Sequence, residues 1–401
     1  MKKRIALFVY GSLWPVGMGS QRVIVEIAKY LHSLPDVSLK IVTIADARHE
    51  AEYRAVCDDV VFVPPVGRWS FWSLLNKVGS RLGIDVFRSF FSSLAYRKKV
   101  AHEMKDCDYV FVNYVVWRWL LPRSVISDKT MVITHDLLFY RRASFSPPRN
   151  VLTKFWFDMN RKLEFSVLRQ FDKIGVFANY EKRLLMDAGF MGDDIVELGM
   201  PISVQPPKDV PLEYDFIFVG GNSYQNEAGI RCFFERVVPL LDGIDSSLVV
   251  VGGICNSTIW SAIDIPKTLR VTRMGYVNDV SDVMSRSLIG VGTVPFGSGV
   301  KVKVVESIMF GLPMVLTNSG VEGIPVLPEA VINIDSEAST DVRIRLASWL
   351  NNRSQTRILG RRAAHALSEK FSPNVALKRI SCCFAHGGLP CPSKNAIILG
   401  N

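Results

Sequence analysis

Short apolar runs alternate along this chain with longer segments in which apolar residues recur every three or four positions. The first pattern is typical of buried strands and the second of amphipathic helices. Strands are expected at residues 3–10, 37–44, 108–113, 130–134, 173–178, 214–219, 247–252, 269–274, 291–295 and 312–316. Helices are expected at residues 22–31, 151–170, 180–188, 226–241, 280–287, 300–310, 341–350 and 355–370. Strands that alternate with helices predict an α/β fold with parallel sheets.

This alternation is interrupted at residues 200–211, whose sequence is MPISVQPPKDVP. Proline lacks an N–H donor and has a fixed φ, so a proline-rich stretch suits neither a helix interior nor a central strand. We therefore place a linker here, between a first domain at 1–203 and a second at 212–372. Residues 373–401 form a C-terminal segment, of which 387–401 shows no clear period and is expected to be a loose tail.

The net charge of +10 favours an acidic partner, such as a nucleic acid, an anionic membrane or a negatively charged substrate. The sequence has no zinc-finger pattern, RNA-recognition motif or basic heptad array, so a nucleic acid is not expected. The seven cysteines are scattered and include no C-x-x-C pair. Together with the lack of a signal-peptide pattern and of an apolar run of about 18 residues, this predicts a cytoplasmic protein.

Residues 68–105 combine aromatic and apolar side chains with many cations and few carboxylates. This composition suits a helix lying in the plane of an anionic membrane surface. It equally suits one or two helices that pack on the sheet and turn a basic face to solvent. Both interpretations stay open, and the first makes a membrane surface a candidate partner.

The stretch 291–323 carries the most chemical information. It contains a short apolar run, the turn Phe296-Gly297-Ser298-Gly299, and then an apolar pattern of helical period that ends at Gly311. A glycine turn that leads into a helix presents free backbone N–H groups and the positive end of the helix dipole at one place. We expect an anion to bind there.

Three charged residues extend this expectation. Lys301 and Lys303 are predicted to lie in the first turn of the helix, where cations are unfavourable unless an anion compensates them. Glu306 follows Lys303 by about one turn. A diphosphate at the helix start, with ribose hydroxyls slightly deeper, would use all three side chains. The alternative is an ordinary surface Lys–Glu pair, worth a few tenths of a kcal/mol.

At these residues the chain resembles the donor-site motif of the retaining, group 1 glycosyltransferases of the GT-B fold. In that family two glutamates are separated by seven residues, and Glu306 matches the second, which holds the donor ribose. Ser298 stands where the first glutamate usually contacts the donor sugar, which leaves the positioning of the sugar open. The family also has a G-x-G-x-x-x-K-x-x-E variant, matched here by Gly297, Gly299, Lys303 and Glu306.

A second resemblance lies at residues 134–136, the sequence THD, directly after an expected strand. In the same family this motif places a histidine at the donor sugar, which makes His135 the first candidate for the reacting centre. Side chains at the carboxyl ends of parallel strands line the crevice of an α/β sheet. A strand-end histidine can also simply cap a backbone group. Asp136 would either orient the imidazole or cap the next helix.

The resemblance also implies roles for residues whose own pattern is weak. In the family the glycine loop here written Gly17-Met18-Gly19-Ser20 faces the cleft between the domains, so Gly19 is a donor-site candidate; a plain strand-to-helix turn is the alternative. Tyr276 and Val277 match a turn that contacts the nucleotide base. The family often has a basic residue after the turn at Gly221, and none follows here. The last helix, at 374–384, is expected to fold back onto the first domain.

The resemblance implies a GT-B protein: two Rossmann-like domains with parallel sheets that face a central cleft. It implies a hexosyltransferase-type enzyme that moves a sugar from a nucleotide-sugar donor to an acceptor hydroxyl with retention, without a metal ion or a cofactor. The acceptor would be a carbohydrate or a lipid-linked precursor of a polysaccharide or lipopolysaccharide, used at the inner face of the cytoplasmic membrane. Two alternatives remain: a nucleotide-sugar 2-epimerase of the same fold and a non-catalytic protein that binds sugar nucleotides.

Overall fold

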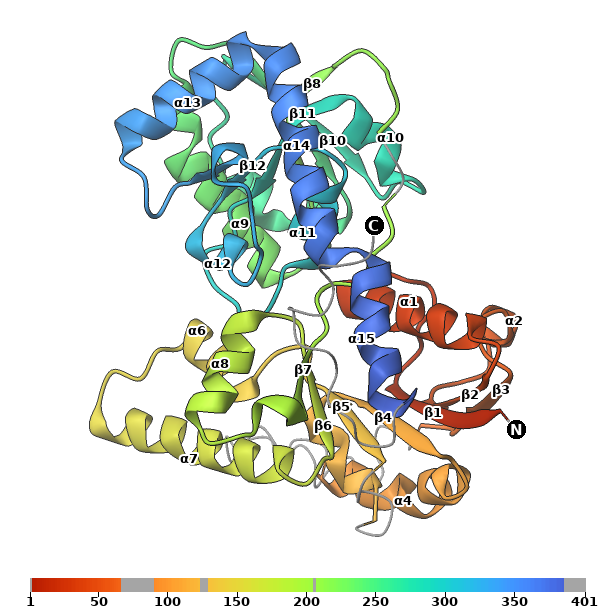
Figure 1. Ribbon diagram of the computed structural model, residues 1–401. Helices are drawn as coiled ribbons and strands as arrows, with labels where there is room; N and C mark the ends of the chain where they lie inside the picture. The colour runs from red at the N-terminus through yellow and green to blue at the C-terminus, as the bar shows by residue number, and fades with distance from the viewer. Residues whose placement is uncertain (1, 66–89, 123–128, 205–206, 386–401) are drawn as a thin grey trace, which may run out of the picture. The chain divides into compact units, whose positions relative to one another are not determined.

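The computed structural model describes residues 2–65, 90–122, 129–204 and 207–385. The chain divides into two units, Met1–Pro201 with Pro373–Asn401 and Ile202–Ser372 (Figure 1). The expected tail at 387–401 lies outside the described residues, as does the part of the aromatic and basic segment at 68–89.

The first unit is built on a seven-stranded parallel sheet of order β3-β2-β1-β4-β5-β6-β7. Its strands are β1 (Lys3–Tyr10), β2 (Val37–Ile44), β3 (Asp59–Phe62), β4 (Tyr109–Asn113), β5 (Thr130–Ile133), β6 (Lys173–Val176) and β7 (Ile195–Glu197). Its α-helices include α1 (Gly19–Ser33), α2 (Glu50–Arg54), α4 (Phe90–Met104), α6 (Leu138–Phe145), α7 (Val151–Leu168), α8 (Asn179–Asp187) and α15 (Pro373–Ala385). The central strands are buried on both faces, which explains their continuous apolar runs.

The second unit is a six-stranded parallel sheet of order β10-β9-β8-β11-β12-β13. Its strands are β8 (Tyr214–Val219), β9 (Ser246–Val251), β10 (Leu269–Gly275), β11 (Ser287–Gly292), β12 (Met314–Leu316) and β13 (Val331–Asn333). Its α-helices include α9 (Tyr224–Arg236), α10 (Val280–Ser285), α11 (Val302–Met309), α12 (Asn318–Val321), α13 (Ser339–Asn351) and α14 (Arg353–Phe371). Counted from its first strand, this order is 3-2-1-4-5-6, that of a Rossmann sheet. The prediction of two Rossmann-like α/β domains is confirmed.

Several expected elements were placed wrongly. The strand expected at 291–295 is β11, which begins at Ser287 and ends at Gly292, because α10 stops at Ser285. Strands β3, β7 and β13, of four, three and three residues, were not predicted. The sequence predicted domains at 1–203 and 212–372, whereas the units of the structure divide after residues 201 and 372.

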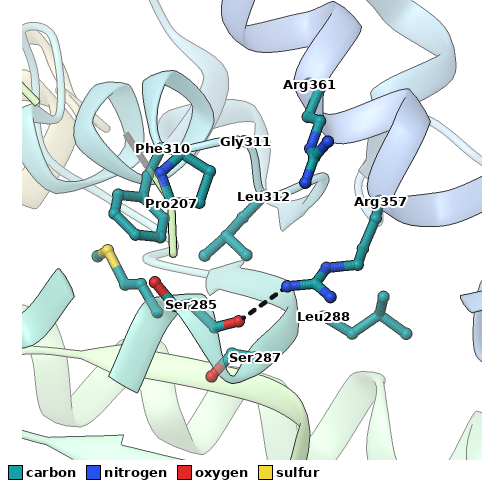
Figure 2. Close-up of a pocket in the computed structure, with 10 residues that line it drawn as sticks. Pro207, Ser285, Ser287, Leu288, Phe310, Gly311, Leu312, Arg357 and Arg361 are labelled. Carbon is teal, nitrogen blue, oxygen red and sulfur yellow. Dashed lines mark hydrogen bonds between the residues drawn. The ribbon is translucent and has the colours of Figure 1, made fainter. Parts of the chain in front are cut away.

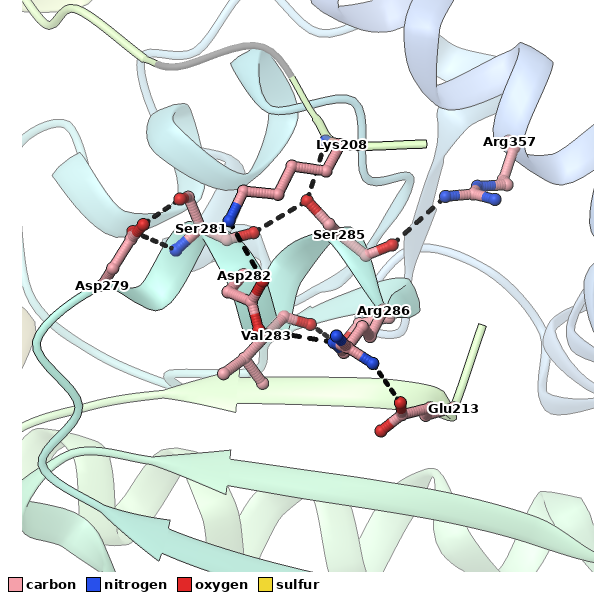
Figure 3. Close-up of polar contacts among 10 residues, drawn as sticks. Lys208, Glu213, Asp279, Ser281, Asp282, Val283, Ser285, Arg286 and Arg357 are labelled. Atoms are coloured by element: carbon pink, nitrogen blue, oxygen red, sulfur yellow. Dashed lines mark hydrogen bonds and ion pairs between the residues drawn. The ribbon is translucent and has the colours of Figure 1, made fainter. Parts of the chain in front are cut away.

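Residues 207–213 are fastened to the second unit by polar contacts with α10 and α14 (Figure 3). The backbone N–H of Lys208 donates to Ser285 Oγ at 2.9 Å, and its ammonium pairs with Asp282 at 3.1 Å. The Arg357 guanidinium donates to the carbonyls of Val210 and Ser285, each at 3.2 Å. These contacts hold the end of the proline-rich segment at the amino-terminal end of β11.

Figure 2 shows a hollow beside this segment, lined by Pro207, Ser285, Phe310, Arg357 and Arg361 among others. Its volume is about 20 Å³, room for a single water molecule. It lies at the amino-terminal ends of β11 and β12, opposite to the end where ligands bind in α/β sheets. We therefore do not assign a ligand to it.

The last helix, α15, belongs to the first unit. The Lys3 ammonium donates to the carbonyl of Phe384 at 2.6 Å, and the Arg379 guanidinium donates to that of Glu197 at 2.6 Å. Long-range contacts of this kind attach the C-terminal helix to β1 and β7.

Helix α14 passes directly over the end of α11. A Cβ built on Gly360 of α14 would lie 1.9 Å from the carbonyl oxygen of Gly311, which follows α11 with φ 95°. Only hydrogen at this position allows the two backbones to approach so closely.

We predict that Gly360→Ala destabilises the protein by about 1–3 kcal/mol, because the added methyl group must push α14 away from α11. Glycine to alanine in an ordinary helix interior stabilises by up to about 1 kcal/mol, so the two effects differ in sign. Chemical denaturation with the exposed Arg362→Ala of the same helix as control measures the difference. A variant as stable as the wild type, or more stable, would contradict the prediction.

Candidate functional site

The strand order of the second unit reverses between β8 and β11, and the loops that follow β8 and β9 lie beside this point. The loop after β9 lies against the loop after β8: a Cβ on Gly252 would lie 2.4 Å from the carbonyl oxygen of Gly220. The N–H of Gly252 donates to the carbonyl of Gly275 at the end of β10, at 2.6 Å. Ligands of open α/β sheets bind at such a reversal.

The loop after β11 is the glycine turn predicted from the sequence. Gly297 and Gly299 have φ values of 115° and 76°, a region that residues with a side chain rarely adopt. The Ser319 hydroxyl donates to the carbonyl of Gly297 at 3.0 Å, and the Phe296 ring stacks on Tyr224. The turn is thus shaped by its glycines and fixed by neighbours from α9 and α12.

Lys303 lies on α11 beside β8. Its Nζ donates to Asn226 Oδ1 at 2.5 Å and sits 5.0 Å above the centre of the Phe218 ring. Burial, and then the nearby Lys301 ammonium, lower the pKa of Lys303 to about 8. The ammonium is therefore held at the start of α11, close to the glycine turn, and a bound anion would favour its charged form.

Asn226, on α9, was not identified from the sequence. Its Nδ2 donates to the carbonyl of Gly221 at 2.9 Å, so its Oδ1 is turned toward Lys303. A Cβ on Gly220 would lie 2.9 Å from Asn226 Cγ. Asn226 thus links the loop after β8 to α11. The sequence shows no basic side chain after the turn at Gly221, where the family often has one. This lack was the signal that a different polar residue, here Asn226, occupies that place.

The position of Lys301 differs from the predicted one. It is the N-cap residue of α11, outside the first turn, and its Nζ donates to the carbonyl of Gly299 at 2.8 Å. Its backbone is extended, with φ −81° and ψ 99°, so the helix begins only at Val302. The side chain braces the glycine turn and adds positive charge beside Lys303.

Ser298 and Glu306 are both half-buried. The Ser298 hydroxyl oxygen is shielded from solvent and has no hydrogen-bond partner among the described residues. A shielded hydroxyl without a partner is costly unless a ligand satisfies it. Glu306 lies on α11 one turn after Lys303, with Oε1 shielded from solvent. Tyr276 is 82% exposed, next to the half-buried Val277.

In the first unit, His135 follows β5 with φ 58°, in the left-handed region that is unusual for a residue with a side chain. Its Nε2 lies 3.0 Å from Oδ1 of the buried Asn113, the last residue of β4. Since Asn113 Nδ2 donates to the carbonyl of Phe8, Asn113 Oδ1 is an acceptor and His135 Nε2 must donate. Nδ1 then carries the lone pair.

Aromatic rings enclose the imidazole. The Tyr114 ring stacks on it with centroids 4.4 Å apart, and the Phe177 ring lies at 5.3 Å. Burial lowers the pKa of His135 to about 3, so the imidazole is neutral at physiological pH. Burial raises the pKa of the Tyr114 hydroxyl, so this ring also stays neutral.

Asp136 was expected either to orient the imidazole or to cap the next helix, and in the structure other residues make these two contacts. It pairs with Arg141 of α6 at 3.2 Å. Asn113 is the partner of the imidazole Nε2, and the first N–H groups of α6, those of Leu138 and Phe139, donate to the carboxylate of Glu164 at 2.9 Å each. Glu164 is 1% exposed and reaches α6 from α7. It therefore fixes the start of the helix that follows His135.

Gly19 is the first residue of α1. The N–H groups of Gly17 and Met18, just before it, both donate to Oε1 of Gln21 at 2.9 Å. Gln21 also donates to the carbonyl of Ser12 at 2.9 Å. Gln21 thus stabilises this turn by hydrogen bonds to its backbone, a role that was not predicted from the sequence. Within the described ranges, no three His, Cys, Asp or Glu side chains are placed to hold a metal ion.

The sequence of this chain was also compared with those of known proteins. Residues 213–342, from just before β8 into α13, match the family model described as glycosyl transferases group 1. No curated protein sequence matches the chain.

Solved structures match nearly the whole chain. HepE of Anabaena in complex with UDP has a TM-score of 0.64 at 14% identity, over 96% of this chain and 100% of that one. Sucrose-phosphate synthase from Thermosynechococcus elongatus has a TM-score of 0.68 at 14% identity, over 96% and 98%. The lipopolysaccharide outer core galactosyltransferase WaaB, in its apo form, has a TM-score of 0.58 at 14% identity, over 95% and 99%. These likenesses show that the chain has the GT-B fold.

The neutral His135 predicts a pH dependence of stability. In the unfolded chain histidine binds a proton below pH 6.5, whereas the folded protein does so only near pH 3. The free energy of unfolding should therefore fall as the pH drops from 6.5, by up to about 1.4 kcal/mol per pH unit. In His135→Asn, whose side chain tolerates the left-handed backbone, this part of the loss should be absent. Urea unfolding at several pH values compares them; parallel profiles would refute the assignment.

Proposed function

We propose that this protein is a glycosyltransferase that moves a sugar from a nucleotide-sugar donor to an acceptor hydroxyl. The observation that supports it best is the arrangement at the start of α11. A glycine turn, the Lys303 ammonium and the Ser298 hydroxyl, which has no hydrogen-bond partner within the described segments, lie close to the strand-order reversal of a GT-B fold. The match of residues 213–342 to group 1 glycosyltransferases points to the same activity.

The chemistry follows from the charge that develops on the leaving group. When the glycosidic bond breaks, a nucleoside diphosphate departs with negative charge on its phosphate oxygens. Lys303, the backbone N–H groups of the glycine turn and the dipole of α11 would stabilise this charge, with Lys301 adding to the local positive potential. We propose that these groups provide the positive charge themselves, so that the enzyme works without a resident metal ion or cofactor. Glu306 would accept hydrogen bonds from the donor ribose.

His135 is the candidate residue of the reacting centre in the first unit. Its Nδ1 accepts hydrogen bonds and its ring stays neutral. The imidazole is therefore better suited to accept a hydrogen bond from a sugar hydroxyl than to donate a proton to the leaving group. We propose retention of the anomeric configuration, as in the family that the chain resembles. There the acceptor attacks on the face of the leaving group, and the diphosphate takes the proton.

The structural neighbours indicate which substrates to test. HepE is described in complexes with UDP, with UDP and glucose and with UDP-glucose, and WaaB is a lipopolysaccharide galactosyltransferase. We propose a hexose donor activated by a nucleoside diphosphate and a carbohydrate or lipid-linked acceptor in surface polysaccharide assembly. We further propose that the protein acts in the cytoplasm, at the inner face of the membrane. No helix in the described part of the chain is long and apolar enough to span a bilayer.

A first experiment is a thermal-shift screen with UDP-, GDP- and dTDP-sugars, followed by assays of nucleotide release with and without acceptors. Stabilisation by one donor, and release that requires an acceptor, are expected. A nucleotide-sugar 2-epimerase would change the donor in the absence of any acceptor. Donor binding without turnover across all acceptors would favour the non-catalytic alternative, for which Ser298 in the place of a glutamate is the motivating observation.

We predict that Lys303→Ala lowers kcat/KM for transfer by about 30- to 1,000-fold. This corresponds to about 2–4 kcal/mol for one charged contact in the transition state. The exposed Lys267→Ala, in the same unit but before β10, serves as the matched control and should leave the kinetics unchanged. Equal kinetics for Lys303→Ala and the wild type would remove Lys303 from the phosphate site.

The lowered pKa of Lys303 predicts that the affinity for free UDP depends on pH. The unliganded ammonium loses its proton near pH 8, whereas a bound diphosphate would hold it. Binding should therefore weaken about tenfold between pH 7 and pH 9.

Isothermal titration of UDP into wild type and Lys303→Arg provides the test. Arginine stays charged over this range, so the variant should lose less than twofold. A wild-type affinity that does not change between pH 7 and pH 9 would contradict the predicted titration.

A further inference from the structure

Residues 145–156 form an exposed projection of the first unit. They comprise the end of α6, a loop and the first six residues of α7, and each residue is exposed. Figure 1 shows this loop, drawn in yellow, at the outer edge of its unit. We call this stretch the α6–α7 projection.

The projection carries five large apolar side chains that face water. Their exposed fractions are 45% for Phe145, 88% for Val151, 66% for Leu152, 61% for Phe155 and 39% for Trp156. Clustered exposed apolar residues of this kind mark an interaction surface, whereas single ones are ordinary.

The helical part of the projection is ordered by its own cap. Asn150 Oδ1 accepts from the N–H of Thr153 at 2.9 Å, and Thr153 Oγ1 accepts from the N–H groups of Arg149 and Asn150 at 3.0 Å. Val151, Leu152, Phe155 and Trp156 stand at i, i+1, i+4 and i+5 and so share one helix face. Among the described residues this apolar face is left exposed on a helix that is already formed.

Cations outnumber carboxylates around this face, and the nearest carboxylate on α7, Asp158, pairs with Arg161 at 2.9 Å. From residue 137 to residue 157 the sequence has four cations, at positions 141, 142, 149 and 154, and no carboxylate. Arg142, Arg149 and Lys154 are exposed, whereas Arg141 pairs with Asp136. Aromatic side chains backed by cations match the interface of an anionic bilayer, where rings enter the headgroup region and cations meet lipid phosphates.

We propose that the α6–α7 projection docks on an anionic lipid bilayer, inserting its apolar face while Arg149 and Lys154 contact the headgroups. In the sequence the projection is separate from residues 68–105, for which a membrane role was expected and of which 68–89 is outside the described residues. The proposal does not require the transferase activity, because it rests only on the exposed side chains and their charges.

The experiment is co-sedimentation of the full chain with phosphatidylcholine vesicles, with and without 30% phosphatidylglycerol. We expect binding to the mixed vesicles only. Phe155→Ser with Trp156→Ser should weaken it at least tenfold. Arg149→Gln with Lys154→Gln should weaken it about thirtyfold, from about 1 kcal/mol for each cation.

Two control variants are matched to these. Met186→Ser with Met191→Ser removes exposed apolar side chains elsewhere in the first unit, and Lys98→Gln with Lys99→Gln removes exposed cations from α4. Both should bind vesicles like the wild type. All four double variants change exposed residues, so equal thermal unfolding and equal UDP binding verify that they are folded.

Three results would overturn the proposal: no vesicle binding by the wild type, wild-type binding by both projection variants, or loss of binding only in the α4 variant. Light scattering adds a fourth. If the wild type is a dimer in solution and Phe155→Ser with Trp156→Ser makes it monomeric, the projection is a contact between two copies of this chain. UDP binding and nucleotide release in solution are measured separately, so a failure of the membrane proposal is distinguishable from a failure of the proposed activity.

Discussion

The contact between the Lys303 ammonium and the Asn226 amide is the interaction on which the candidate donor site depends. It holds a lysine at the point where the strand order of the second unit reverses. The ammonium is partly removed from water above the Phe218 ring, and burial lowers its pKa. In such surroundings the ammonium gains more from a bound anion than an exposed lysine would, because less water competes for it. The amide keeps it in place without neutralising its charge, which a carboxylate would do.

The two units divide the chemistry according to charge. The second unit gathers lysines around the glycine turn, where the leaving diphosphate of the proposed reaction would need them. The first unit presents the neutral imidazole of His135, oriented by Asn113 and enclosed by rings. The helix after it is fixed by Glu164, a buried carboxylate satisfied by backbone N–H groups. A carboxylate buried and satisfied in this way determines where the start of α6 lies.

Local patterns in the sequence carried much of this description. The alternation of strands and helices, the glycine turn, and the places of Lys303 and Glu306 on one helix are encoded within a few residues of each other. Asn226 is 77 residues from Lys303, and Glu164 is 26 residues from Leu138. Such residues come into contact only when the chain folds, and no spacing in the sequence predicts these contacts. Lys301 was misplaced by one position because helix boundaries depend on backbone angles that a periodic pattern does not determine.

The close approach of Gly360 to Gly311 has a consequence for protein engineering. Helix α11 begins beside the lysines of the candidate site and ends under α14, with backbone touching backbone. A displacement of α14 would therefore shift α11, whose other end carries Lys303 of the candidate site. Chimaeras that exchange this part of the chain for that of another protein of the same fold should exchange β11 through α14 as one cassette, since a junction between α11 and α14 would combine two helices that do not fit each other.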